Sequence, residues 1–408
     1  MSTDALITLI DGLYRQSFGK LLDVLLKSFP DLEFTEAEDI LQESFSAALV
    51  HWKDKGVPDN PKGWLYQVSR NKTIDWLRDK NRFSGVVQEH HLIAEENTAQ
   101  DFKISDYTLG MLCACVHPDL APKTQMIVTL KYVMNLKVEA IARAFAMTID
   151  GIDKILVRGR EKIKADNIRL TVPENIQDRL PIIHKIIYLI FNEGYKASYG
   201  PELIREELCE EALLLCKELL DSHLGDRNTE ALYALMLFNS ARLEARFDSQ
   251  GNILDLENQN RELWNKDLIA LGSHYLFASN KDEASSFHVE ASIGWLHCSA
   301  PSFESTNWNL IAGLYSRLMK IQHNPFLQLN LAVALFNAGE RKKALELAHE
   351  LAEQHFFSQY YLLNATLGKF YLLEGNKNIA REFLLKAINQ THFDTEKEFI
   401  RKMLQRTS

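Results

Sequence analysis

The sequence lacks the features of a membrane or secreted disulfide-rich protein. No apolar run among its 408 residues approaches the roughly 20 residues that a membrane-spanning helix needs. The first residues, MSTDALITLIDGLYRQ, have no basic flank and no small-residue cleavage site, so they predict the start of a helix rather than a signal peptide. The five cysteines are odd in number and scattered, which argues against a disulfide framework. Together these absences favour a cytoplasmic protein with reduced thiols.

Signs of enzymatic chemistry are also missing. There is no glycine-rich phosphate-binding loop, and no nucleophile, base and orienting group align near Glu193 or Tyr195 in YLIFNEGYKAS. Cys113, Cys115 and His117 are too close together for the usual zinc spacing, and the two cysteines are expected to pack as small hydrophobic side chains. We therefore expect no catalytic residues, no metal site and no cofactor.

Charge is distributed unevenly along the chain, whose formal net charge is −9. Residues 1–170 hold 22 Lys and Arg against 24 Asp and Glu, and residues 171–408 hold 24 against 31. In the first part, residues 30–43 carry six acids and no base, whereas residues 61–82 carry six bases and two acids. Residues 131–169 carry nine bases and five acids. Two basic segments suit phosphate contacts at two places, although each alone is equally consistent with a solvated helix face.

Helical periodicity dominates the sequence, and the alternation typical of strands is nearly absent, so the predicted fold is all-α. A polar, weakly periodic segment at 81–101 predicts a linker, and a proline at Pro173 interrupts the pattern again. Near the C-terminus two helix–turn–helix segments share a glycine and an alanine, each pair separated by 36 residues: Gly339 and Gly375, Ala344 and Ala380. This spacing predicts tetratricopeptide-like hairpins.

The segment MNLKVEAIARAFAMTIDGIDKILVRGREKIK, from Met134 to Lys164, has the pattern of a helix-turn-helix that reads DNA. Thr148 is expected to cap the second helix, whose N-terminal part, with Asp150 and Lys154, would face base edges. Gly151 and Asp153 are departures, because glycine lowers helix propensity and an acid either accepts from cytosine or repels phosphate. Basic residues near the end of that helix are expected to hold phosphates, namely Arg158, Arg160, Lys162 and Lys164.

A resemblance to a known family extends these predictions. PKTQMIVTLKYVMNLKVEAIARAFAMTIDGIDKILVRGREKIK resembles region 4 of bacterial sigma-70 family factors, and AEDILQESFSAALVHWKDKGVPDNPKGWLYQVSRNKTIDWLRDKNR resembles region 2 of their extracytoplasmic-function class. CACVHPDLAPKTQ, YLIFNEGYKAS and LCEEALLL are similar to the subgroup with a long C-terminal extension. The expected segments are region 2 at 1–82, a linker at 83–105, region 4 at 106–166, a helical extension at 167–320 and tetratricopeptide-like repeats at 321–408.

The resemblance implies roles for region 2. The AEDILQESF helix is expected to dock on core RNA polymerase through Asp39, Gln42 and Glu43, with Ile40, Leu41 and Phe45 facing inward. The rest of region 2 is expected to bind and help melt promoter DNA. Trp52, Trp64 and Trp76 have apolar helical spacing and are expected in the core rather than stacked on bases. The candidate DNA-binding residues of region 2 are Lys53, Asp54, Asn60, Arg70, Asn71, Lys72, Arg78, Lys80 and Arg82.

The predicted function is that of a sigma factor, without catalysis of its own, that directs core RNA polymerase to promoters. The C-terminal extension is expected to contact the sigma regions within the chain and to regulate them, because it is acidic and they carry basic segments. The alternative is a helix-turn-helix regulator with a helical sensor domain that never joins polymerase. The region 2 pattern discriminates between the two, because an ordinary regulator has no use for it.

Overall fold

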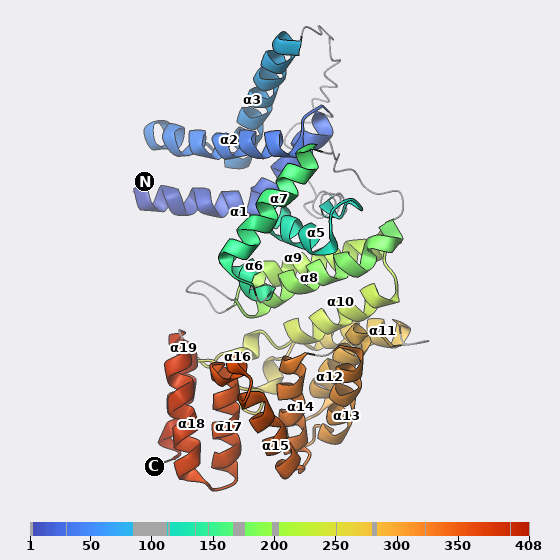
Figure 1. The fold of residues 1–408 in the computed structure, drawn as a ribbon, viewed down its shortest axis with the longest axis vertical. Helices are drawn as coiled ribbons and strands as arrows, with labels where there is room; N and C mark the ends of the chain where they lie inside the picture. Colours follow the sequence, from blue (N-terminus) through green and yellow to red (C-terminus); the bar gives the residue numbers. More distant parts are fainter. Residues whose placement is uncertain are drawn as a thin grey trace. The chain divides into compact units, whose positions relative to one another are not determined.

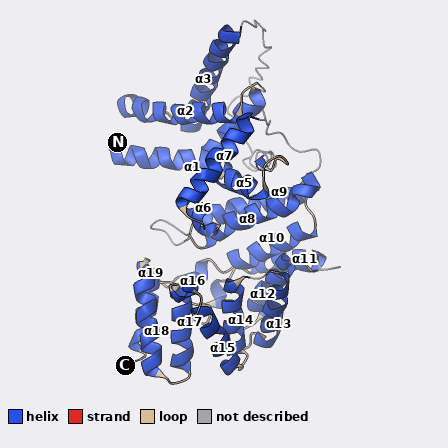
Figure 2. Cartoon of the chain, viewed as in Figure 1, coloured by secondary structure: helices blue, strands red, loops and turns tan. Residues whose placement is uncertain are grey.

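The structure is a computed structural model that describes residues 3–29, 31–84, 112, 115–134, 136–145, 147–165, 176–197, 204–249, 251–279, 284–322, 324–391 and 393–407. Regular structure in these ranges is helical and includes no β-strand (Figures 1 and 2), which confirms the predicted all-α fold. None of these helices is long and apolar enough to cross a bilayer. The chain forms two compact units, Met1–Tyr199 with Glu210–Leu224 and Gly200–Cys209 with Gly225–Ser408. The sequence predicts five segments, which divide the chain more finely than these two units. Their boundaries stay predictions.

The first unit contains the charged segments of the N-terminal half (Figure 1). In chain order its elements are α1 (Thr3–Ser28), α2 (Phe34–Lys55), α3 (Pro61–Ser84), α5 (Pro122–Val128), the π-helical turn η1 (Thr129–Val133), α6 (Val138–Ala144), α7 (Ile149–Ala165), the 3-10 turn η2 (Ile176–Arg179), α8 (Leu180–Tyr195) and most of α9 (Glu206–Asp221).

Helices α1, α2 and α3 pack on one another around an aromatic and aliphatic core. Helix α2 begins with a capping box, in which the Glu33 N–H donates to the Glu36 carboxylate at 2.8 Å, and it ends at Gly56 with φ of 84°. Its buried face meets α1, where the rings of Tyr14 and Phe45 lie edge to face with centroids 4.8 Å apart. Helices α1 to α3 therefore form a small helical module around buried apolar side chains.

Helix α5 runs directly into the π-helical turn η1, and both pack on helix α8. In η1 the N–H of Met134 donates to the carbonyl of Thr129 at 3.1 Å, five residues back, where an α-helix would use the residue four back. The turn is buried on one side through Leu130, Tyr132 and Val133. Because a π turn carries an extra residue, it ends the helix with a broader turn and redirects the chain toward α6.

The second unit is a succession of antiparallel helices (Figure 1). Its elements after the start of α9 are α10 (Arg227–Ser240), the 3-10 turns η3 (Glu244–Arg246) and η4 (Arg261–Leu263), α11 (Lys266–Ser279), α12 (Ser286–Ser299), α13 (Trp308–Ile321), α14 (Pro325–Asn337), α15 (Arg341–Ala352), the short α16 (His355–Ser358), α17 (Tyr361–Leu373), α18 (Lys377–Gln390) and α19 (Asp394–Gln405).

The two segments with matched glycine and alanine spacing each fold as a helical hairpin, α14 with α15 and α17 with α18. Gly339 and Gly375 stand in the turns with φ of 91° and 81°, a region that glycine enters without the strain a side chain would add. Ala344 and Ala380 are completely buried where the paired helices meet. The 36-residue spacing in the sequence thus places each glycine, and each alanine, at the same position in two successive hairpins.

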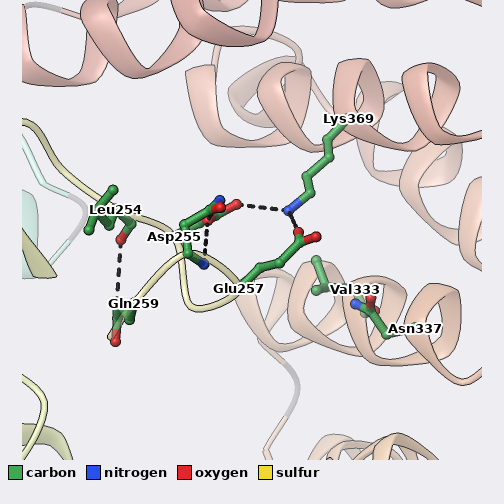
Figure 3. Close-up of polar contacts among 8 residues, drawn as sticks. Leu254, Asp255, Glu257, Gln259, Val333, Asn337 and Lys369 are labelled. Atoms are coloured by element: carbon green, nitrogen blue, oxygen red, sulfur yellow. Dashed lines mark hydrogen bonds and ion pairs between the residues drawn. The ribbon is translucent and has the colours of Figure 1, made fainter. Parts of the chain in front are cut away.

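An acidic connection between η3 and η4 lies across these hairpins (Figure 3). Lys369 on α17 donates to Asp255 Oδ2 at 2.8 Å and to Glu257 Oε2 at 2.7 Å. Between the two carboxylates, Leu256 packs against the apolar cluster formed by α12, α13 and α14. Lys369 and Lys402, which pairs with Asp248 at 3.2 Å, therefore both attach this non-helical segment to the C-terminal helices.

Candidate nucleic-acid interface

The outer face of α2 carries the three residues predicted to contact polymerase. Asp39, Gln42 and Glu43 are exposed on this helix, whereas Ile40, Leu41 and Phe45 are buried, as the sequence pattern predicted. Each polar side chain already has a partner in the chain: Gln42 donates to Glu38, Glu43 pairs with Lys72 at 2.7 Å, and Asp39 lies near Arg160. The face is thus polar, accessible and electrostatically linked to neighbouring helices.

The basic residues of α3 divide between two sides of the helix. Lys72 and Lys80 reach α2, where they pair with Glu43 at 2.7 Å and with Glu36 at 2.9 Å. Lys80 also lies over the ring of Trp76, with its nitrogen 4.3 Å from the centroid. On α3 itself, Arg78 pairs weakly with Asp75 at 3.5 Å. Two predicted DNA-binding lysines therefore neutralise acids of the predicted polymerase-binding helix.

The other candidates on α3 lie apart from those lysines. Asn71 is exposed and accepts from Gln67 at 3.3 Å, and Arg70 is half-buried. The side chain of Arg82, at the end of the helix, lies outside the described part of the chain.

The connection between α2 and α3 presents Lys53 and Asp54 to solvent. Asn60 has a structural role that the sequence reading missed, because its side-chain oxygen accepts from the N–H of Gly63 at 2.9 Å and caps α3. Among the three tryptophans, Trp52 is buried as expected, but Trp64 and Trp76 are half-buried. Trp64 stacks on the ring of His51 at 5.3 Å, so part of its surface is covered by a polar ring rather than by core.

Helices α6 and α7 form the predicted pair across a short turn. Thr148 Oγ1 accepts from the N–H of Gly151 at 3.1 Å, which confirms the predicted cap of α7. A Cβ on Gly151 would lie 3.1 Å from that oxygen and 3.2 Å from Met147 Cε. Gly151, which the sequence analysis noted as a departure from helix propensity in α7, therefore leaves room for the Thr148 cap and for the Met147 side chain.

The outward face of α7 holds the remaining candidates of region 4. Ile152, Leu156 and Ile163 are buried, while the exposed candidates are Asp150, Lys154, Arg158 and Lys162. Asp150 pairs with Lys154 at 2.6 Å, one turn further along the exposed surface. Because both side chains are solvated, the pair contributes little to stability, and Lys154 partly neutralises the negative charge of Asp150.

Arg160 differs from the other basic residues of α7, because it reaches α2. Its guanidinium lies 3.4 Å from Glu38 Oε2 and 3.6 Å from Asp39 Oδ1. Asp39 is two-thirds exposed, but the Glu38 side chain is only 4% exposed. Burial raises the pKa of Glu38 to about 7, against the opposing effect of Arg160. The same setting raises the pKa of Tyr14 and of Tyr132 to about 12, through burial first and then the charge of Glu38.

Glu38 was missed by the sequence reading, although its signal was present. It precedes Leu41 by three residues and Phe45 by seven, which places it on the buried face of α2 rather than on the acidic outer face. The sequence analysis counted it only as one of six acids in the 30–43 segment. A carboxylate that shares the helical spacing of the apolar residues indicates a buried side chain, and a buried carboxylate needs a partner.

The extension shows no arrangement of catalytic groups in its described residues. Glu193 and His184 are buried on α8, and no group of His, Cys, Asp and Glu in the described ranges could hold a metal ion. Cys115 is buried, whereas Cys113 lies outside the described residues.

Comparisons with known proteins fit this arrangement of charged helical modules. Residues 13–83, which span most of α1 to α3, match the model for Sigma-70 region 2. Residues 179–280 match a family of unknown function, DUF6596. No solved structure matches the chain.

Similarity to whole proteins extends well beyond region 2. The chain is 30% identical to an uncharacterized protein of Rhizobium meliloti (strain 1021), over 94% of this chain and 92% of that protein. It is 26% identical to the ECF RNA polymerase sigma factor SigM of Bacillus subtilis (strain 168), over 38% of this chain and 93% of SigM. It is 24% identical to the sigma factor SigV of the same organism, over 42% of this chain and 94% of SigV.

The fold and the site define an all-α protein in which a region 2 module is followed by further helical segments. The chain belongs to the sigma-70 family, in its extracytoplasmic-function class, and it carries a long C-terminal extension.

Proposed function

We propose that this sigma factor binds core RNA polymerase through α2 and directs it to promoter DNA through α3 and α7. The observation that carries the proposal is the region 2 match over α1 to α3, because this module has no role in a regulator that never joins polymerase. The exposed polar residues of α2, Asp39, Gln42 and Glu43, supply the polymerase contact. Proteins of this family are not enzymes as a class, and the chain needs no catalysis of its own for this role.

DNA contacts are assigned to two surfaces. On region 2 they comprise Lys53, Asp54, Asn60, Arg70, Asn71, Lys72, Arg78, Lys80 and Arg82. On region 4 they comprise Thr148, Asp150, Lys154, Arg158, Arg160 and Lys162. Backbone phosphates would be held by the arginines and lysines, so binding should weaken steeply with salt. Capture of unpaired bases near the α2–α3 connection would support melting.

The test combines purified chain with core polymerase and measures transcripts from genomic promoter fragments. We expect co-elution with polymerase and transcripts that start at discrete sites, with both lost or strongly reduced in a Glu43→Arg, Asp39→Arg variant. Arg381→Ala, on α18 of the extension, is the control and should leave initiation unchanged. Tight binding to duplex DNA by the chain alone, together with no association with polymerase, would instead favour the regulator that acts without polymerase.

The extension is proposed to regulate the sigma modules. Two observations support this: α8, which follows region 4, packs on α5 and η1, and residues 171–408 are acidic while regions 2 and 4 carry basic segments. A chain ending at Leu224 keeps every element of the first unit and removes Gly225–Ser408, so it separates loss of regulation from loss of the region 4 core. Transcription by this shortened chain should differ several-fold from that of the full chain. Equal activity and an equal response to growth conditions would refute the regulatory role.

A further inference from the structure

Two arginines of the second unit lie close to the same tryptophan ring. Arg261, on η4, donates from Nη1 to the carbonyls of His297 and Ala300, at 2.7 Å each. Its guanidinium carbon lies 4.4 Å from the centroid of the Trp264 ring. Arg242, which follows α10, has its guanidinium carbon 6.0 Å from the same centroid. Both guanidinium groups therefore lie in one small region beside the end of α12.

This pair of arginines has no acidic partner among the described residues. Neither guanidinium forms an ion pair with a carboxylate there, and the exposed Glu304 acts on Arg261 more weakly than Arg242 does. Burial lowers the pKa of Arg261, and the positive charge of Arg242 adds to that effect. Lys266 brings a third positive charge, because its Nζ donates to the carbonyl of Arg261 at 3.0 Å. Like charges gathered without a counter-charge attract anions.

Hydrogen-bonding atoms in the same cluster also lack partners. Trp264 is only 2% exposed, and its Nε1–H has no acceptor; Nη2 of Arg261 has none either. Nδ1 of His297 is a further buried atom without a partner. Burial, and then the charges of Arg242 and Arg261, lowers the pKa of His297 to about 3, so this ring is neutral at ordinary pH. Buried donors without an acceptor are unfavourable, and a ligand that accepts hydrogen bonds would satisfy them.

A structural role explains only part of this arrangement. Nη1 of Arg261 stabilises the C-terminal end of α12, where a positive charge meets the carbonyls of the last turn. Arg242 donates from Nε to the Phe238 carbonyl at 3.3 Å and from Nη2 to Asn239 Oδ1 at 2.6 Å. Neither role requires a second arginine beside the first, and neither uses Nη2 of Arg261 or Nε1 of Trp264.

We propose that Arg242, Arg261 and Lys266 form a binding site for a small molecule that carries an oxyanion, either a carboxylate or a phosphate group. The planar guanidinium group can bind two oxygens of such a group at once. Trp264 Nε1 supplies an uncharged donor. Lys266 is exposed and both arginines are half-buried, so an anion meets these charges from solvent and reaches the covered nitrogens as neighbouring side chains rotate. The site gives the extension a chemical input that requires neither polymerase nor DNA.

Isothermal titration calorimetry of the full-length chain tests this site with two probes, inorganic phosphate and malonate, in separate titrations. Sodium chloride keeps the ionic strength constant, so general screening of charge is the same in each titration. We expect saturable binding of one anion per chain for at least one of the probes. Tighter binding of phosphate assigns a phosphate-bearing ligand to the site, and tighter binding of malonate assigns a carboxylate.

Variants that remove one positive charge locate the binding. Arg242→Gln should weaken it at least about tenfold, the loss typical of a charge-assisted hydrogen bond. Lys266→Gln changes an exposed side chain and should weaken binding several-fold while the fold is retained. Arg317→Gln removes the same charge from the exposed surface of α13 and is the matched control, for which we expect unchanged affinity.

Absence of saturable binding for both anions would overturn the site. Binding that is undiminished in Lys266→Gln and in Arg242→Gln would overturn its placement, and so would an equal loss in Arg317→Gln, since the anion would then respond to net charge alone. If Arg242→Gln does not fold, the comparison of Lys266→Gln with Arg317→Gln decides, and equal affinities in these two variants would refute the proposal.

Discussion

Protonation of Glu38 should stabilise the folded first unit. Its pKa rises from 4.5 to about 7 in the folded chain, chiefly because burial disfavours the charged form. The groups that face it are Tyr14 from α1, Asp39 and Gln42 from α2, Lys131 and Tyr132 from η1, and Arg160 from α7. Of these, Arg160 and Lys131 lower the pKa, as does the hydrogen bond from Gln42, and Asp39 raises it, yet burial prevails.

The sign follows from the raised pKa. If unfolding returns Glu38 to water and to its ordinary pKa, the folded state binds the proton more tightly, so its stabilisation is complete below about pH 4.5 and is lost as pH rises through about 7. With these two pKa values, the contribution of Glu38 to the ratio of folded to unfolded protein falls about tenfold between pH 6 and pH 8. That factor corresponds to about 1.4 kcal/mol, and residual structure that covers Glu38 in the unfolded chain would reduce it.

The assay is the free energy of unfolding in urea, recorded from pH 6 to pH 8 at constant ionic strength. Glu38→Gln imitates the protonated side chain, so we expect its free energy of unfolding to change less across this range than that of the unsubstituted chain. Asp39→Asn removes the exposed carboxylate beside the same arginine and should keep the pH response. A parent protein with no response, or a Glu38→Gln variant that retains the full response, would refute the role given to Glu38.

Three further changes test other parts of the structure. Thr148→Ala removes the cap of α7 and should lower stability by about 1 kcal/mol, which hydrogen exchange of the α7 amides will detect, while Thr148→Ser should retain most of it. Lys369→Met leaves two carboxylates without their cation and should lower the thermal midpoint of the second unit by several degrees in calorimetry; an unchanged midpoint would contradict a stabilising role of the Lys369 ion pairs. Gly375→Ala forces a side chain into a left-handed turn and should destabilise its hairpin by about 1–2 kcal/mol in urea unfolding, whereas Gly313→Ala, where the added atom meets nothing within 4 Å, should not.

Local signals in the sequence predicted the helical fold and the cap of α7. The buried face of α2, the cap at Thr148 and the pair of hairpins marked by Gly339 and Gly375 all depend on residues close together in the chain. Apolar residues spaced at the helical period indicate which side chains are buried, because one face of each helix must pack against the core. These features could therefore be derived without knowledge of the tertiary contacts.

Contacts between distant residues were not accessible in this way. The basic residues of α3 seemed to form one DNA-binding surface, but Lys72 and Lys80 are drawn to acids 29 and 44 residues earlier in the chain. Sequence spacing along one helix does not say which neighbour lies beside it, so the partner of Arg160 was equally hidden. The assignment of individual DNA-binding and polymerase-binding residues stays a prediction until the variants are measured.

The close approach of α1 to the end of α5 depends on a single inserted residue. A π turn differs from a regular helical turn by one residue, so deletion of a single codon within 129–133 would restore α-helical phase. Val133 would then rotate relative to α1, and its carbonyl would no longer occupy the space opposite Gly19, which a side chain at that position would fill.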